Sequence, residues 1–277
     1  MKKGICWGTL PPELSVADRL SLAADAGFDG VEPQVAMPES DAFVRYDSSE
    51  AELKEFLRMA RDVGLDLCSV MGGPMSSRVH PIVDDDPAVR AKGKDSIRRL
   101  LEITAILEAE ALLLVPHWVN DRVRYDVCYE RTLEALQELG PEAEAMGVVI
   151  AVENVWNKFL LSPIEFARII DEADSPAVQA YFDVGNYMPW AYPHHWIEIL
   201  GDRIARVHVK DYRLDVGSGR GFVQLLHGDV PWPEVRKALK DIGYDGWITA
   251  EVGRLKHFPK ESIYDTAVAI DRIVALA

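Results

Sequence analysis

The chain has 277 residues, with 30 lysines and arginines against 45 aspartates and glutamates, and a formal net charge of -15. A hydrophobic fraction of 48% and a charged fraction of 27% are typical of a globular protein and exclude a disordered or fibrous one. The acidic balance argues against nucleic acid as a partner, because binding to a phosphate backbone depends on clustered lysine and arginine. No apolar run approaches the about 20 residues of a membrane span. Three widely spaced cysteines favour a reducing compartment, the cytoplasm.

Short apolar segments alternate with longer amphipathic ones, which is typical of β-strands that are each followed by an α-helix. The expected strands are 3–7, 29–32, 65–70, 111–115, 148–153, 178–182, 204–209 and 247–251. The expected helices are 16–26, 51–63, 88–108, 126–146, 164–173, 194–200, 235–242 and 263–276. Four of these helices end at a glycine that can adopt the left-handed conformation, namely Gly27, Gly64, Gly147 and Gly243. Ser15 and Ser162 are the expected N-caps of two helices.

Eight strand–helix units in about 250 residues predict a single (β/α)8 TIM-barrel domain over residues 1–277. An open, doubly wound sheet is the alternative architecture, but it usually has fewer strands. No Gly-x-Gly-x-x-Gly motif follows the first strand, so the nucleotide-binding version of that fold has no support.

Four successive strands end on a side chain that can bind a metal ion. These side chains are Glu153, Asp183, His208 and Glu251. In a TIM barrel the carboxyl ends of the strands meet at one pocket, where three carboxylates would repel one another without a cation. Oxygen ligands with one nitrogen favour Mn²⁺, with Mg²⁺ and Co²⁺ as alternatives and Zn²⁺ still open. The competing interpretation is that each carboxylate separately caps a helix or pairs with lysine or arginine.

These four residues, with the segments 183–186 (DVGN) and 208–211 (HVKD), resemble the xylose isomerase-like TIM barrels. The resemblance extends from 27–32 (GFDGVE) through 228–230 (GDV) and 243–246 (GYDG) to Glu251, which is essentially the whole chain. It is strongest for the sugar phosphate isomerase/epimerase branch, and it also suggests assembly as a homodimer or homotetramer.

The resemblance implies a metal-dependent isomerase or epimerase that acts on a small sugar or sugar phosphate. Its chemistry would proceed through an enediolate, with Glu153 and Glu251 as the acid and base on opposite faces of the substrate. Return of the proton to the opposite face of the same carbon gives epimerisation, return to the neighbouring carbon gives isomerisation, and loss of a β-hydroxyl gives dehydration. The sequence leaves these three outcomes open.

The remaining candidates are polar and aromatic residues near strand ends, each with a structural alternative. The substrate-binding candidates are Glu32, His117, Trp118, Trp156, Asn186 and Lys210. Aromatic faces suit the C–H surface of a sugar, although a tryptophan there is equally explained by packing. Two positions depart from the family pattern: Asn186 stands where ketose 3-epimerases carry a histidine, and His227 stands where related members carry an acid. The segment 213–227 contains the glycine-rich stretch 217–221, whose backbone N–H groups could bind a phosphate, but a mobile lid or a simple surface loop is favoured. The segment 76–87 is another candidate lid.

Three further functions compete with the isomerase or epimerase. One is a dehydratase of a cyclic keto-polyol, similar to inosose dehydratase. Another is a nuclease similar to endonuclease IV, which would need additional histidines at strand ends and a basic groove. The last is a non-catalytic sugar-binding barrel. The acidic charge and Asn186 disfavour the nuclease, and no membrane or nucleic-acid partner is expected.

Overall fold

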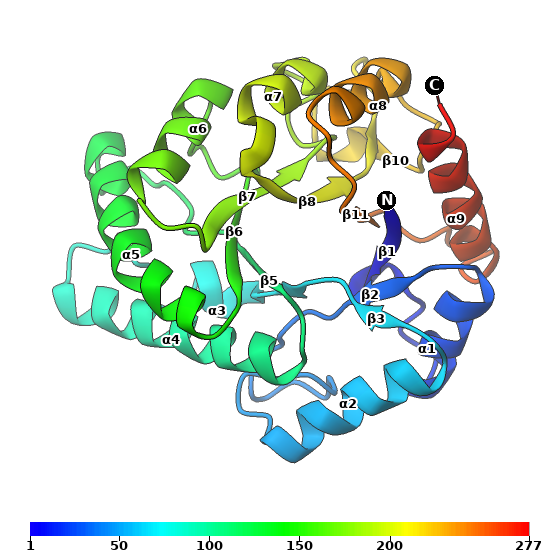
Figure 1. Cartoon of the computed structure of the whole chain (residues 1–277), viewed down its shortest axis with the longest axis horizontal. Coiled ribbons are helices and arrows are strands. Elements are labelled where there is room, and N and C mark those ends of the chain that lie inside the picture. The colour runs from blue at the N-terminus through cyan, green and yellow to red at the C-terminus, as the bar shows by residue number, and fades with distance from the viewer. Residues whose placement is uncertain (277) are drawn as a thin grey trace. The chain divides into compact units, whose positions relative to one another are not determined.

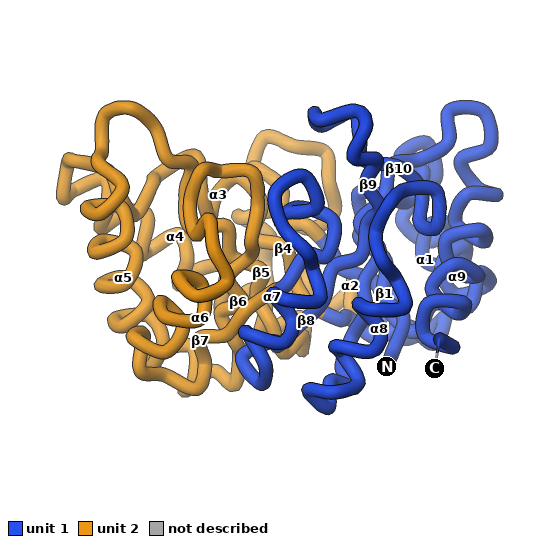
Figure 2. The backbone as a smooth tube through the Cα atoms, turned by 90° about the horizontal axis from the view of Figure 1, so that it is seen from above, with its two compact units in different colours: residues 1–33, 58–68, 182–277 blue, residues 34–57, 69–181 orange. Residues whose placement is uncertain are grey.

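The computed structural model describes residues 1–276, which divide into two compact units (Figure 2). Of these described residues, unit 1 comprises 1–33, 58–68 and 182–276, and unit 2 comprises 34–57 and 69–181. Within the described residues, no helix is both long and apolar enough to cross a membrane.

Unit 1 contains parallel strands in the order β3-β2-β1-β11-β8, followed by the end of β7. The bounds are β1 Lys2–Cys6, β2 Gly30–Glu32, β3 Asp66–Leu67, β8 Ile204–Val209 and β11 Trp247–Ala250. Its helices are α1 Val16–Asp25, α7 Pro193–Leu200, α8 Trp232–Asp241 and α9 Glu261–Val274, and they lie on one side of the strands (Figure 1). The strands are nearly continuous apolar segments because both of their faces are buried.

Unit 2 contains the strand order β7-β6-β5-β4. The bounds are β4 Val70–Met71, β5 Ala111–Leu114, β6 Val149–Glu153 and β7 Val178–Asp183, and the last two residues of β7 belong to unit 1. Its helices are α3 Gly73–Ser77, α4 Pro87–Ile106, α5 Tyr125–Ala145 and α6 Pro163–Glu172. Helix α2, Glu50–Asp62, begins in unit 2 and ends in unit 1.

The helix ends have the predicted left-handed glycines and serine N-caps. Gly27 and Gly147 have φ values of 87° and 69°, in the left-handed region that a side chain disfavours. Ser15 accepts a hydrogen bond from the backbone N–H of Asp18, and Ser162 accepts one from that of Glu165. These caps satisfy N–H groups that have no partner within the helix.

The structure differs from the sequence prediction in three places. The strand expected at 65–70 is two short strands, β3 and β4. Helix α3, which ends at Ser77, includes the first two residues of the segment 76–87, which was expected to be a loop or lid. The segment 213–227 contains a short 3-10 helix, Gly219–Gly221, and the strand β10, Phe222–Val223, which pairs antiparallel with β9, Asp211–Tyr212. All three are too short to produce a periodic pattern of apolar residues.

Candidate metal centre

Three of the four predicted ligands lie together in unit 1. Asp183 ends β7, His208 is the penultimate residue of β8, and Glu251 directly follows β11. His208 is the register partner of Thr249, and the backbone N–H of Glu251 donates to the carbonyl of Val209 at 3.0 Å. The parallel strands therefore end at the same edge, and a ligand atom from each of the three side chains lies within 4.8 Å of the others.

The Asp183 carboxylate is completely buried, and its two oxygens have different surroundings. Oδ1 accepts backbone N–H groups of Gly185 at 2.9 Å and Asn186 at 2.8 Å. Oδ2 lies 3.1 Å from the Lys210 ammonium and 3.9 Å from Nδ1 of His208. The turn after β7 thus fixes the rotation of the carboxylate and turns Oδ2 toward the other charged groups. Burial raises the pKa of Asp183, even though Lys210 opposes that shift.

Lys210 is the cation that this cluster already contains. Its ammonium pairs with Oδ2 of Asp183 and donates a hydrogen bond to Oε2 of Glu251, while its stem lies against Gly185. A Cβ at Gly185 would lie 2.4 Å from Cγ of Lys210, so the glycine of the DVGN segment is required by close packing. Burial favours the neutral form of Glu251, but Lys210 and His208 outweigh it and hold the pKa of Glu251 below its usual range.

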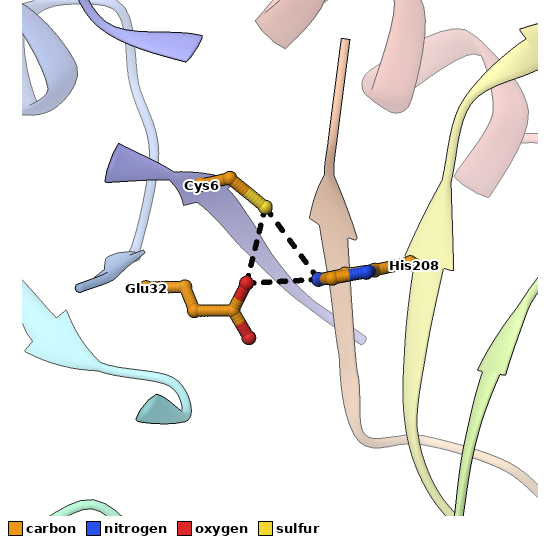
Figure 3. A group of neighbouring side chains, drawn as sticks. All are labelled: Cys6, Glu32 and His208. Carbon is orange, nitrogen blue, oxygen red and sulfur yellow. Dashed lines mark hydrogen bonds and ion pairs between the residues drawn. The ribbon is translucent and has the colours of Figure 1, made fainter. Parts of the chain in front are cut away.

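His208 is fully buried, and its two ring nitrogens face different groups. Nδ1 lies 3.9 Å from Asp183 Oδ2 and 3.8 Å from Glu251 Oε2. Nε2 lies 2.9 Å from Oε2 of Glu32, and Cys6 completes a triangle with these two residues (Figure 3). Burial and the Glu32 carboxylate raise the pKa of the Cys6 thiol well above its usual value, so the thiol is protonated at neutral pH.

The donor set of Asp183, His208 and Glu251 fits a divalent cation. Ligand atoms bound to one ion at about 2.1 Å are separated by about 3 to 4 Å, and Nδ1 of His208 lies 3.8 and 3.9 Å from the two carboxylate oxygens. These separations are too long for hydrogen bonds. Carboxylate oxygens with one imidazole nitrogen are the ligands that Mn²⁺, Co²⁺ and Zn²⁺ accept.

Glu153, the fourth predicted ligand, is the last residue of β6 in unit 2 and is 6% exposed. It is the register partner of Tyr181 on β7, two residues before Asp183. Its role as a ligand and as an acid or base stays a prediction.

The predicted substrate-binding residues have varied environments. Glu32 is 1% exposed and contacts His208, and the backbone N–H of Asn186 donates to Asp183. In unit 2, burial lowers the pKa of His117 to about 3, which keeps the imidazole neutral, and its ring centroid lies 4.4 Å from that of Phe159. Trp118 is 42% exposed beneath the Arg78 guanidinium at 4.6 Å, and Trp156 is half-buried. A role for these residues in substrate binding remains a prediction.

Sequence reasoning missed two roles near the site. Cys6 is not among the predicted site residues, yet its thiol contacts Glu32 and His208. Asp211 is buried and accepts hydrogen bonds from the backbone N–H of Val230 and from the indole N–H of Trp232. The GDV segment is therefore anchored to β9, and His227 before it is exposed. The spacing of HVKD and GDV could not reveal this contact, because it joins residues 19 positions apart across a loop.

Comparison with known proteins identifies the family of the chain. The family model described as xylose isomerase-like TIM barrel matches residues 20–271. The chain is 28% identical over 254 residues to a putative L-ribulose-5-phosphate 3-epimerase, SgbU, of Escherichia coli, covering 90% of this chain and 87% of the relative. It is 26% identical over 265 residues to D-psicose 3-epimerase of Agrobacterium fabrum, covering 91% of this chain and 84% of the relative.

A crystal structure of D-psicose 3-epimerase in the presence of D-fructose superposes with a TM-score of 0.82 at 21% identity, covering 100% of both chains, which establishes the common fold. The relatives named here are epimerases, a class of isomerase. The match of the family model over most of the chain, the TIM-barrel fold and the predicted ligands at the strand ends lead to one conclusion: the chain belongs to the xylose isomerase-like TIM barrel family.

Proposed function

We propose that this protein is a divalent-metal-dependent sugar epimerase or isomerase. The observation that carries the proposal is the convergence of Asp183, His208 and Glu251 at the ends of β7, β8 and β11. The names of the relatives support a ketose or ketose phosphate as substrate, because ribulose 5-phosphate and psicose both carry a carbonyl next to a hydroxyl-bearing carbon. Mn²⁺ is the proposed ion, with Mg²⁺, Co²⁺ and Zn²⁺ as alternatives.

We assign Glu153 as the fourth ligand. It ends the strand that pairs with β7, and its register partner Tyr181 precedes Asp183 by two residues. Side chains two residues apart on a strand point to the same face. Glu153 therefore belongs to the same strand end as Asp183.

Acid–base catalysis is assigned to Glu153 and Glu251. A bound divalent ion supplies positive charge beside the carbonyl and the adjacent hydroxyl of the substrate, which acidifies the C–H between them and stabilises the enediolate. The Glu251 side chain is 34% exposed, whereas the side chains of Asp183 and His208 are completely buried. Of these three residues, Glu251 is therefore the one that a substrate can reach. Its lowered pKa keeps it ionised, as a base that removes a proton must be.

Lys210 holds the Glu251 carboxylate in place and partly offsets its charge. We propose that Asn186, Trp156, His117 and Trp118 contribute to sugar binding, with the aromatic faces against the C–H surface of the substrate. We assign Glu32 to hydrogen bonding with His208 rather than to binding of the sugar, because its carboxylate is almost completely buried against the His208 ring.

The proposal includes one domain formed by the whole chain and assembly as a homodimer or homotetramer. We propose a cytoplasmic location, because the three cysteines are buried thiols and thiols persist in a reducing compartment. The net charge of -15 disfavours a nucleic-acid substrate.

Proton exchange in D₂O tests the proposal. The protein is loaded with Mn²⁺, Mg²⁺ or Co²⁺ in turn and incubated with ketoses, their phosphates and inososes, and deuterium uptake is followed by NMR. Uptake with formation of an epimer or aldose is expected, and it should disappear in Glu153→Gln and in Glu251→Gln. Loss of water from an inosose instead would identify a dehydratase. Absence of uptake from every substrate with every metal would refute the function.

A further inference from the structure

Glu32 and His208 are 176 positions apart in the chain and meet in the interior of unit 1 (Figure 3). Oε2 of Glu32 lies 2.9 Å from Nε2 of His208, a normal hydrogen-bond length. Glu32 is 1% exposed and His208 is 0% exposed, so water does not weaken this contact. A carboxylate buried at this point needs a donor, and the imidazole provides one.

The contact determines which nitrogen of His208 carries the proton. An ionised carboxylate only accepts hydrogen bonds, so Nε2 must be the N–H. Nδ1 of the neutral ring then keeps its lone pair, and Nδ1 is the nitrogen that faces Asp183 and Glu251 at 3.9 and 3.8 Å. The ring is thereby presented as a ligand, with its free lone pair toward the two carboxylates.

Cys6 supplies a second donor to the same oxygen. Its Sγ lies 3.1 Å from Oε2 of Glu32 and 3.5 Å from Nε2 of His208. Cys6 and Glu32 are register partners on β1 and β2, so their side chains emerge next to each other on one face of the sheet. With the thiol and the imidazole N–H both directed at Oε2, the carboxylate is held from two sides.

We propose that Glu32 is a positioning residue that sets the tautomer and orientation of His208, and that Cys6 holds Glu32 in place for that purpose. This inference rests on the proposed function, because it assumes that Nδ1 of His208 binds the metal ion. Histidine ligands of metals generally donate their other N–H to a carboxylate, and loss of that partner usually weakens metal binding by about 10- to 100-fold.

The same three residues could instead form a second cation site. Ligands in a tetrahedral site, with bonds of about 2.0 to 2.3 Å, stand about 3.3 to 3.7 Å apart. The Glu32–His208 and Cys6–Glu32 separations of 2.9 and 3.1 Å are shorter and correspond to hydrogen bonds. We therefore assign the triangle to support of His208 rather than to a separate ion.

The first experiment reads the tautomer in the metal-free protein. Long-range ¹H–¹⁵N correlation spectra of the histidine rings, with His208→Gln to assign the signals, should show the Nε2–H form of His208 in the wild type. Glu32→Gln should shift His208 toward the Nδ1–H form, because the amide N–H₂ can donate to Nε2. An Nδ1–H ring in the wild type, or an unchanged tautomer in Glu32→Gln, would overturn the proposal whether or not the protein binds metal.

The second experiment measures Mn²⁺ affinity by electron paramagnetic resonance. Glu32→Gln should bind Mn²⁺ about 10- to 100-fold more weakly than the wild type, and Glu138→Gln, a surface control on α5, should bind it equally well. Cys6→Ser retains a donor and should remain within about threefold of the wild type. If Glu32→Gln does not fold, Glu32→Asp takes its place, with an intermediate loss expected from the shortened reach.

An affinity in Glu32→Gln equal to that of the wild type would overturn the proposal. So would an intense thiolate-to-cobalt absorption band in the Co²⁺-loaded protein that is lost in Cys6→Ser, because it would identify Cys6 as a ligand. A wild type that binds no ion refutes the proposed function alone, and the tautomer experiment still decides the role of Glu32.

Discussion

Replacing Lys210 with methionine removes the ammonium that pairs with both Asp183 and Glu251 while keeping most of the side-chain volume. The ammonium pairs with both carboxylates and is 12% exposed. Removing one partner of a buried ion pair costs about 3 to 5 kcal/mol, because the remaining charge stays buried without compensation. Glu251 is 34% exposed and partly hydrated, so the lower end, about 3 kcal/mol, is expected for the metal-free protein.

The assay is thermal and urea unfolding after dialysis against a chelator. For a chain of this size, about 3 kcal/mol corresponds to a decrease in Tm of about 6 °C. Lys237→Met is the matched control, because Lys237 pairs with Asp241 on the surface of α8 with 70% and 50% of the side chains exposed. Such a pair contributes less than about 1 kcal/mol.

Addition of Mn²⁺ should then stabilise Lys210→Met more than it stabilises the wild type, because the ion replaces the missing positive charge between the two carboxylates. If Lys210→Met loses no more stability than Lys237→Met, the lysine is not compensating buried charge. If Mn²⁺ stabilises the variant and the wild type equally, the ion does not bind beside Asp183 and Glu251.

Three further predictions concern the stability of the fold. Burial lowers the pKa of His117 to about 3 in the folded protein, against about 6.5 in the unfolded chain, so only the unfolded chain takes up the proton as pH falls below 6.5. Between pH 7.5 and 5.5 the wild type should therefore lose about 1 kcal/mol more stability than His117→Asn. Equal losses of the two proteins in urea unfolding would contradict this prediction. Gly228→Ala would place a Cβ 2.2 Å from Oδ1 of Asp211 and should lower the free energy of unfolding by about 1 to 3 kcal/mol. The control Gly219→Ala, whose Cβ would have no atom within 4 Å, should change it by less than about 0.5 kcal/mol. Equal urea unfolding midpoints for the two variants would show that the GDV segment can shift to accept a Cβ without loss of stability. Ser162→Ala should cost about 1 kcal/mol and Ser162→Gly a few tenths, and a larger loss in the glycine variant would argue against the N-cap of α6.

The order of the strands and helices could be predicted from the sequence because it depends on local patterns. Apolar segments, helical periodicity and glycines such as Gly27 and Gly147 act over a few residues, and the structure has a strand or helix at nearly every expected place. Strand ends follow directly from that order. Asp183, His208 and Glu251 could therefore be recognised as one group before any contact between them was known.

What surrounds these predicted ligands depends on contacts between distant segments of the chain. The hydrogen bond from His208 to Glu32 joins β8 to β2, and the thiol of Cys6 reaches both from β1. Sequence spacing predicts that Glu32 lies at a strand end, but the same position could equally contact a substrate hydroxyl. Which nitrogen of His208 faces the carboxylates, and which cation lies between Asp183 and Glu251, depends on the register of parallel strands and on burial, and these arise only when residues far apart in the chain pack together.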